Sequence, residues 1–152
     1  MGRKPQWGQS RVYNPEFAAR GMADVVWWDI FPVQDGEIIR VTFESVNSEL
    51  PQGLWLRTDR GLDINGQHCK SAALWHETAP TDVLCKCHTS DGNLSVYNMF
   101  IDATGVQMDQ AASSGMLVEE LPCGRRYRCN DIGFDTAFDK LVFRVERVEC
   151  RE

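Results

Sequence analysis

The sequence has no long apolar run and no excess of basic side chains. Its most apolar stretch, residues 25–31, is interrupted by Asp29, whereas a helix that spans a bilayer needs about 18 or more consecutive apolar residues. The formal net charge is -6 at pH 7, whereas binding to a phosphate backbone depends on clustered Lys and Arg. We therefore expect neither a membrane nor a nucleic acid as the partner.

A secretion signal is missing from the start of the sequence. The basic residues Arg3 and Lys4 are not followed by an apolar segment, which a signal peptide requires. The sequence thus predicts a cytoplasmic location, where thiols stay reduced. All six cysteines are accordingly expected to be free thiols: Cys69, Cys85, Cys87, Cys123, Cys129 and Cys150.

Helical periodicity is nearly absent, and after Gly21 the apolar residues recur with a period of two. This period is typical of strands with one buried face. Eight or nine short strands separated by turn signals predict a sandwich or barrel architecture, and 152 residues fit one domain. We predict a single all-β domain with little helix, an antiparallel β-sandwich of jelly-roll or immunoglobulin-like topology. Residues 1–20 are expected to form an N-terminal arm and residues 21–150 the sandwich.

Local signals predict several individual elements. Asn14 followed by Pro15 favours a short helix over residues 15–20. The dipeptide Asn65-Gly66 suits a tight hairpin, and the polar residues 89–93 are expected to join strands 83–88 and 94–101 as a second hairpin. Two strands have a clear inner face, made by Ile39, Val41 and Phe43 in one and by Leu141, Phe143 and Val145 in the other.

A further hairpin is predicted around Pro122-Cys123-Gly124. A turn of these three residues places Leu121 opposite Arg125 and Leu117 opposite Cys129. In this register Glu119 falls on the apolar face. The prediction therefore requires either a bulge or an unseen partner for this carboxylate.

An acidic segment follows that hairpin. Its hard oxygen donors are those that calcium prefers, and the candidate metal ligands are Asn130, Asp131, Asp135 and Asp139. The alternative is a structural loop in which these side chains bond the local backbone while Phe134 and Phe138 fill the end of the sandwich.

Residues 130–143 also resemble a known local pattern. Asn130-Asp131 and the stretch from Phe134 through Asp135, Asp139 and Leu141 to Phe143 resemble the acidic loop and closing strand of uncharacterised, lectin-like β-sandwich domains, some associated with calcium. The resemblance covers about fifteen residues and departs from the pattern at Thr136, Ala137 and Lys140. It implies a sandwich fold and calcium as a candidate cofactor.

Soft metal ligands occur in a second region. Cys85, Cys87 and His88, together with His68-Cys69 and His76, are residue types that bind zinc. On a regular strand, however, Cys85 and Cys87 face one way and His88 the other. The alternative is that the cysteines are buried thiols. No Gly-x-Ser-x-Gly or His-Glu-x-x-His motif accompanies the histidines, so the sequence favours a protein without catalytic activity.

Aromatic side chains give the remaining candidate site. Exposed indole rings beside polar groups hold sugar rings in many sandwich domains. The predicted ligand-binding residues are Trp28, Trp55, Trp75, Tyr97 and Arg128. The alternatives are core packing for the aromatic rings and a solvated cross-strand ion pair for the arginine.

These features favour a non-enzymatic binding module for carbohydrate, calcium or both. A protein that binds another protein, such as an immunity or structural assembly component, is the first alternative. A jelly-roll metalloenzyme is the second, and it requires several histidines to converge on one metal.

Overall fold

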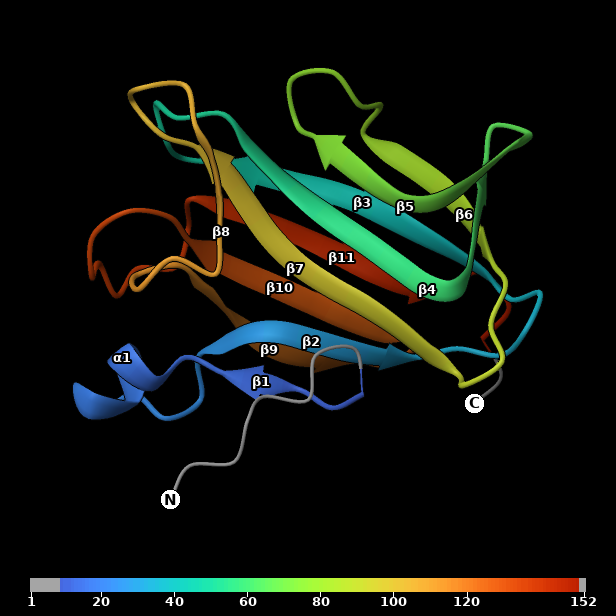
Figure 1. The fold of residues 1–152 in the computed structure, drawn as a ribbon, viewed down its shortest axis with the longest axis horizontal. Coiled ribbons are helices and arrows are strands. Elements are labelled where there is room, and N and C mark those ends of the chain that lie inside the picture. The colour runs from blue at the N-terminus through green and yellow to red at the C-terminus, as the bar shows by residue number, and fades with distance from the viewer. Residues whose placement is uncertain (1–8, 151–152) are drawn as a thin grey trace.

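The computed structural model describes residues 9–150 as eleven strands and one short helix. Figure 1 shows long strands wrapped around a common interior, with short elements at its margins. The elements are β1 (Val12–Tyr13), α1 (Pro15–Ala19), β2 (Val26–Pro32), β3 (Ile38–Val46), β4 (Gln52–Ile64), β5 (Gln67–Trp75), β6 (Asp82–Cys87), β7 (Asn93–Ile101), β8 (Gln107–Asp109), β9 (Gly115–Leu121), β10 (Gly124–Asn130) and β11 (Leu141–Arg147).

Eight of these strands close into an antiparallel barrel. Their order around the wall is β2, β9, β10, β11, β3, β6, β4 and β7, and β7 pairs again with β2. The three remaining strands lie outside this circuit: β1 pairs with β2, β5 with β4, and β8 with β7. The only helix among residues 9–150, α1, has five residues and is far too short to cross a bilayer.

The closed wall confirms the all-β prediction and shows that the predicted β-sandwich, in either topology, is wrong. The sandwich implied by the resemblance of residues 130–143 is wrong for the same reason. Alternation identifies the buried face of each strand. It does not decide whether that face meets a second sheet or the far side of its own sheet. Here the decision comes from the pairing of β7 with β2, across about 65 residues of chain.

The barrel interior is filled with side chains. Ile39, Val41, Leu141, Phe143 and Val145 are fully buried, as predicted, and Phe43 is nearly so. An eight-stranded barrel is just wide enough either to be filled in this way or to hold one small ligand. Because the interior is packed, a ligand site has to be sought on the outer wall or at the barrel ends.

Two predicted hairpins had different outcomes. The Asn65-Gly66 hairpin is confirmed, since it joins β4 to β5 and both residues have positive φ. The predicted hairpin across residues 89–93 is wrong, because β4 lies between β6 and β7 and pairs with both. The connection instead crosses β4 near its middle, where the Asp59 carboxylate accepts hydrogen bonds from Thr89 and Ser90.

The hairpin of β9 and β10 is present, but its predicted register is wrong. The turn has two residues, not three, so Leu121 pairs with Gly124 and Glu119 with Arg126. Gly124 belongs to the strand, where it lies so close to β11 that an added Cβ would meet the Val145 carbonyl oxygen. The shift by one residue moves Glu119 to the outer face, and this removes the need for a bulge.

The expectation that all cysteines are free is wrong for one pair. A disulfide joins Cys123 in the β9–β10 turn to Cys150 after β11. The two are brought together because β10 pairs with β11 and the Arg147 amide donates to the Cys123 carbonyl oxygen, 2.8 Å away. The free cysteines are Cys69, Cys85, Cys87 and Cys129, as predicted. The cytoplasmic location stays a prediction.

The predicted helix near the N-terminus is confirmed. The Asn14 side chain accepts hydrogen bonds from the amides of Glu16 and Phe17 and caps α1. Phe17 then packs with Val25 and Phe138 in a small cluster outside the barrel. Of the predicted arm, residues 1–8 lie outside the described residues, whereas β1 and α1 contact the barrel.

Candidate functional site

Three of the predicted ligand-binding residues meet on the outer wall of the barrel. Trp55 in β4 pairs directly with Tyr97 in β7, and Trp28 lies beside them in β2. The ring centroids are 4.8 Å apart for Trp55 and Tyr97, 4.9 Å for Trp28 and Tyr97, and 5.8 Å for the two indoles. We call Trp28, Trp55 and Tyr97 the outer aromatic cluster.

The period of the strands explains why these rings point outward. Leu54 and Leu56 are buried inside the barrel, so Trp55 between them faces the opposite side. Asp29 likewise faces the interior, which turns Trp28 outward. A sequence pattern can indicate each of these directions, but the meeting of three strands at this point depends on the closure of the barrel.

Tyr97 is the fixed centre of the cluster. Its ring lies nearly buried between the two half-buried indoles. Its hydroxyl donates a hydrogen bond to Asp109 of β8 at 3.1 Å. Burial, with the nearby Asp109 carboxylate, raises the pKa of Tyr97, so the phenol stays protonated at neutral pH. The cluster is therefore a rigid, uncharged set of rings.

Polar groups lie around these rings. Arg57 follows Trp55 by two residues on the same face of β4 and is exposed. Ser71 of β5 pairs with Arg57, and Asp109 is exposed beyond Tyr97. Apolar rings bordered by a guanidinium, a hydroxyl and a carboxylate can pack against the face of a sugar and bond its hydroxyl groups.

The other two predicted ligand-binding residues lie elsewhere. Trp75 is at the end of β5, where its indole packs on the backbone of Gly53. Arg128 is on the outer face of β10, and its guanidinium lies 3.8 Å from the Glu119 carboxylate. Strand β9 separates β10 from β2, so the structure does not bring Arg128 to the outer aromatic cluster.

The first two predicted metal ligands make hydrogen bonds within the protein, although the buried side-chain oxygen of Asn130 takes part in none among the described residues. The amide of Asn130 donates to the carbonyl oxygens of Ser113 and Gly133. The carboxylate of buried Asp131 accepts hydrogen bonds from Ser48 at 2.6 Å and Gln52 at 2.9 Å. Both side chains thus tie loops together at one end of the barrel.

The second two predicted metal ligands share a cation that the chain itself supplies. The ammonium of Lys140 lies 3.3 Å from Asp135 and 3.6 Å from Asp139. Asp139 also accepts a hydrogen bond from Asn47. A backbone hydrogen bond from Ala137, followed by that from Lys140, lowers the pKa of Asp135. Calcium binding at this loop stays a prediction, and an added ion would have to compete with Lys140.

The predicted cysteine ligands for zinc face the barrel interior. Cys85 and Cys87 are fully buried, whereas His88 is on the outer side, as the strand period requires. Burial raises the pKa of both thiols to about 12. They are therefore protonated at neutral pH, whereas zinc binds the thiolate.

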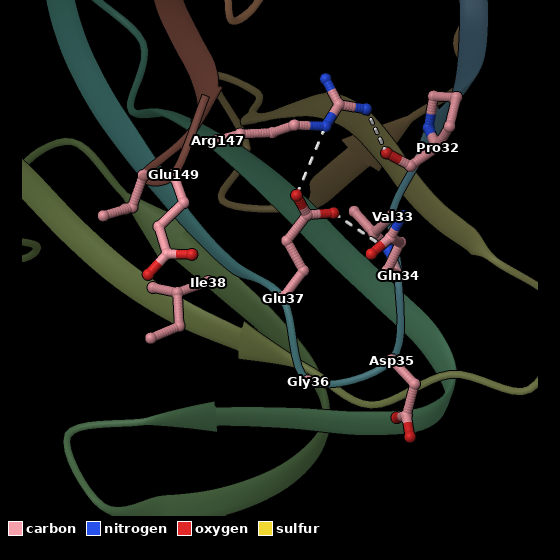
Figure 2. Close-up of a pocket in the computed structure, with 10 residues that line it drawn as sticks. Pro32, Val33, Gln34, Asp35, Gly36, Glu37, Ile38, Arg147 and Glu149 are labelled. Atoms are coloured by element: carbon pink, nitrogen blue, oxygen red, sulfur yellow. Dashed lines mark hydrogen bonds and ion pairs between the residues drawn. The ribbon is translucent and has the colours of Figure 1, made fainter. Parts of the chain in front are cut away.

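A cavity at one barrel end includes none of the predicted residues. Its volume is about 780 Å³, and it is lined by the β2–β3 connection and by the chain at the end of β11. Figure 2 shows Glu37 at its centre, where the carboxylate accepts from the Gln34 amide at 3.0 Å and lies 3.5 Å from Arg147. Arg147 also donates to the Pro32 carbonyl oxygen. The central charged groups of this cavity are thus already paired with each other.

Comparison of the chain with protein-family models, with curated protein sequences and with solved structures gave no significant match. The fold itself defines the class of protein, a closed eight-stranded antiparallel β-barrel with three outer strands. Since one fold supports many functions, function has to be argued from the sites on this barrel.

Proposed function

We propose that this protein is a carbohydrate-binding module that holds a sugar ring on the outer aromatic cluster. The observation that carries the proposal is the mutual contact of Trp28, Trp55 and Tyr97 on the outside of the wall. Rings from three neighbouring strands are held in place before a ligand arrives. Little conformational entropy is then lost on binding.

The chemistry of the cluster suits a sugar better than a flat, fully apolar ligand. The aliphatic face of a pyranose packs against an indole, while its hydroxyl groups need donors and acceptors at the edge of the ring. Arg57 supplies donors, Asp109 supplies acceptors, and Ser71 supplies both. No group has to act as an acid, a base or a nucleophile, so the proposal is for binding without catalysis.

Glycan-array screening followed by calorimetry with the bound glycans tests the proposal. Trp55→Ala removes one of the two half-buried indoles that flank Tyr97, the one on the same strand as Arg57, and is expected to weaken binding at least about tenfold, which equals roughly 1.4 kcal/mol. Trp75→Ala is the matched control, because it removes a half-buried indole from the next strand outside the cluster.

Two results would contradict the proposal. One is the absence of glycan binding by the folded wild-type chain at millimolar concentration. The other is an equal loss of affinity in Trp55→Ala and Trp75→Ala, since this would indicate a general effect on the fold. A protein partner that copurifies with the wild type and is lost only in Trp55→Ala would instead favour the protein-binding alternative.

A further inference from the structure

Asp63 and two histidines form a compact cluster on the outer wall, away from the outer aromatic cluster. One carboxylate oxygen of Asp63 lies 2.8 Å from Nδ1 of His68, and the other lies 2.7 Å from Nε2 of His88. The imidazole centroids are 5.6 Å apart. We call these three residues the Asp63 cluster.

Strands β4 and β5, and the residue that follows β6, contribute to this cluster. The Asn65-Gly66 turn places Asp63 directly opposite His68 in the β4–β5 pair. On its other edge, the end of β4 pairs with the end of β6, and the His88 amide bonds the Gly61 carbonyl oxygen. Both histidines therefore approach Asp63 from neighbouring strands.

A bulge in β4 allows the strand to bring Asp63 close to both histidines. Between Arg57 and Leu62 the register shifts, and β4 leaves β7 for β6. The Thr58 hydroxyl stabilises the bend through bonds to the amide and carbonyl of Gly61. Gly61 has φ +95°, and a Cβ there would come within 2.6 Å of Nε2 of His68. A glycine at this point thus gives the imidazole room beside the backbone.

We propose that the Asp63 cluster is a binding site for one divalent transition-metal ion of the zinc type, with Asp63, His68 and His88 as its protein ligands. Within residues 9–150, these are the only three His, Cys, Asp or Glu side chains whose ligand atoms all lie within 4.8 Å of one another. Imidazole nitrogen and carboxylate oxygen are the donors that such ions accept.

Small side-chain rotations suffice to surround an ion. Zinc–ligand bonds of about 2.0–2.2 Å place tetrahedral ligand atoms roughly 3.3–3.6 Å apart. In the Asp63 cluster one ligand atom from each residue lies within 4.8 Å of the other two, and each imidazole nitrogen is 2.7–2.8 Å from its carboxylate oxygen. The side chains of His68, Asp63 and His88 are 57%, 35% and 30% exposed, so they can rotate toward an ion. Three protein ligands leave at least one position for water or another exogenous ligand.

The charges at the cluster also favour a cation. The Asp63 carboxylate, 35% exposed, carries a negative charge at neutral pH. The site contains nitrogen donors that calcium does not prefer. Lys86 pairs with Asp63 across β4 and β6 and is exposed, so its flexible ammonium can move into solvent when an ion binds.

Titration of the chelator-treated, tag-free full chain with Co²⁺ tests this assignment. Cobalt replaces zinc in such sites and reports its ligands in the visible spectrum. We expect one equivalent to bind with the spectrum of nitrogen and oxygen ligands and to be displaced by Zn²⁺ but not by Ca²⁺. A thiolate-to-cobalt charge-transfer band would overturn the assignment, because it would identify cysteine as a ligand.

Single substitutions in the Asp63 cluster provide a second test of the proposed metal site. Asp63→Asn, His68→Gln and His88→Gln are each expected to weaken Co²⁺ binding by tenfold or more. His76→Gln is the matched control, since His76 packs against Phe43 outside the cluster and its loss should leave binding unchanged. The assignment fails if the wild type binds no stoichiometric Co²⁺, or if His76→Gln weakens binding as much as the three cluster variants. Circular dichroism confirms that each variant is folded.

Discussion

Two aspartates in this barrel have the same arrangement of partners and opposite surroundings. Asp29 holds Arg11 at 2.6 Å with one carboxylate oxygen and Arg125 at 2.9 Å with the other. Asp63 likewise divides its two oxygens between His68 and His88. The Asp29 carboxylate is completely buried, whereas that of Asp63 is 35% exposed.

The surroundings of Asp29 indicate a structural role. It lies where β2 closes the barrel against β7, opposite Val96, and three residues beyond the single residue pair, Val26 and Met116, that joins β2 to β9. The Tyr127 hydroxyl donates to the same carboxylate at 2.6 Å, and Arg125 also bonds the Ile30 carbonyl oxygen. Side chains of β10 thus bond β2 directly where β2 and β9 share only one residue pair, and we call this region the seam.

The comparison of Asp29 with Asp63 indicates that the arrangement of partners around a carboxylate does not by itself make a ligand site. The exposure of the carboxylate to solvent also matters. A buried carboxylate between guanidinium groups cannot release its partners without leaving unpaired charges in the protein interior, which solvates charges poorly. An exposed carboxylate between imidazoles can exchange its partners for a metal at little cost, because water solvates every group during the exchange. We therefore assign Asp29 a structural role, whereas the exposure of Asp63 supports the proposed metal site.

The largest effect is expected when the two aspartates are compared by the same substitution. Asp29→Asn removes the buried charge between two half-buried guanidinium groups and should lower the free energy of unfolding by about 3–5 kcal/mol. Asp63→Asn should leave the urea midpoint unchanged, since its charged groups are solvated. Urea unfolding followed by tryptophan fluorescence measures both.

Equal destabilisation by these two variants would contradict the different roles that we assign to Asp29 and Asp63. It would mean that Asp63 is needed for the fold, and the argument that its partners are exchangeable would then be lost. If Asp29→Asn does not accumulate as soluble protein, that result agrees with the predicted loss of stability, provided that Asp63→Asn remains soluble.

A smaller change at the seam refines the role of Asp29. Tyr127→Phe removes the buried hydroxyl that donates to the carboxylate and is expected to cost about 1.5–3 kcal/mol. Because the ring stacks on Phe143 at 4.9 Å, phenylalanine preserves the packing. A urea midpoint equal to that of the wild type would show that the guanidinium groups alone satisfy Asp29.

The contrast between buried and exposed groups extends to the free thiols. Burial, followed by the charge of neighbouring groups, raises the pKa of Cys85 and Cys87 from 9.0 to about 12. In the native protein at pH 8, iodoacetamide should label half-exposed Cys69 at least about a hundredfold faster than these two. Mass spectrometry after timed quenching measures the rates, and comparable labelling of all three would contradict the burial.

The same thiols predict the direction of a pH effect. A folded pKa above the unfolded value means that the native state keeps protons that the unfolded chain loses. The contribution of Cys85 and Cys87 to stability is therefore complete below about pH 9 and is lost as the pH rises toward 12. Replacing both by alanine should flatten this alkaline decline, which thermal unfolding at a series of pH values can test.

Local elements were predictable because their causes are local. Asn14 and Pro15 predict α1 from capping and backbone geometry, and Asn65-Gly66 predicts a turn from its positive φ angles. The alternation in β3 and β11 predicts their buried faces correctly. Each of these signals acts within a few residues, so no knowledge of the rest of the chain is needed.

Partners distant along the chain were not predictable from the same signals. The β6 and β7 strands follow one another and resemble a hairpin, yet β4 lies between them. In the β9–β10 hairpin, counting Gly124 in the turn moves Glu119 to the wrong face. In each case the apolar pattern fits more than one pairing, and contacts made elsewhere select between them.

The candidate sites were likewise predictable only in part. The residue types of Trp28, Trp55 and Tyr97 indicate ring stacking from the sequence, but the separation of Trp75 and Arg128 from them depends on strand order. Asp63 was predictable only as part of a hairpin turn. Its contact with His88 arises because the β4 bulge leads to β6.

By itself, the sequence determined that this protein is built from strands with one apolar face, where several of the turns lie, and which residue types are suited to bind a ligand. Only the tertiary structure decided that the sheet closes into a barrel, which rings and which ligand atoms meet, and which cysteines bond. The physical reason is that side-chain alternation and turn geometry act over a few residues, whereas closure and site assembly depend on contacts between strands far apart in the chain.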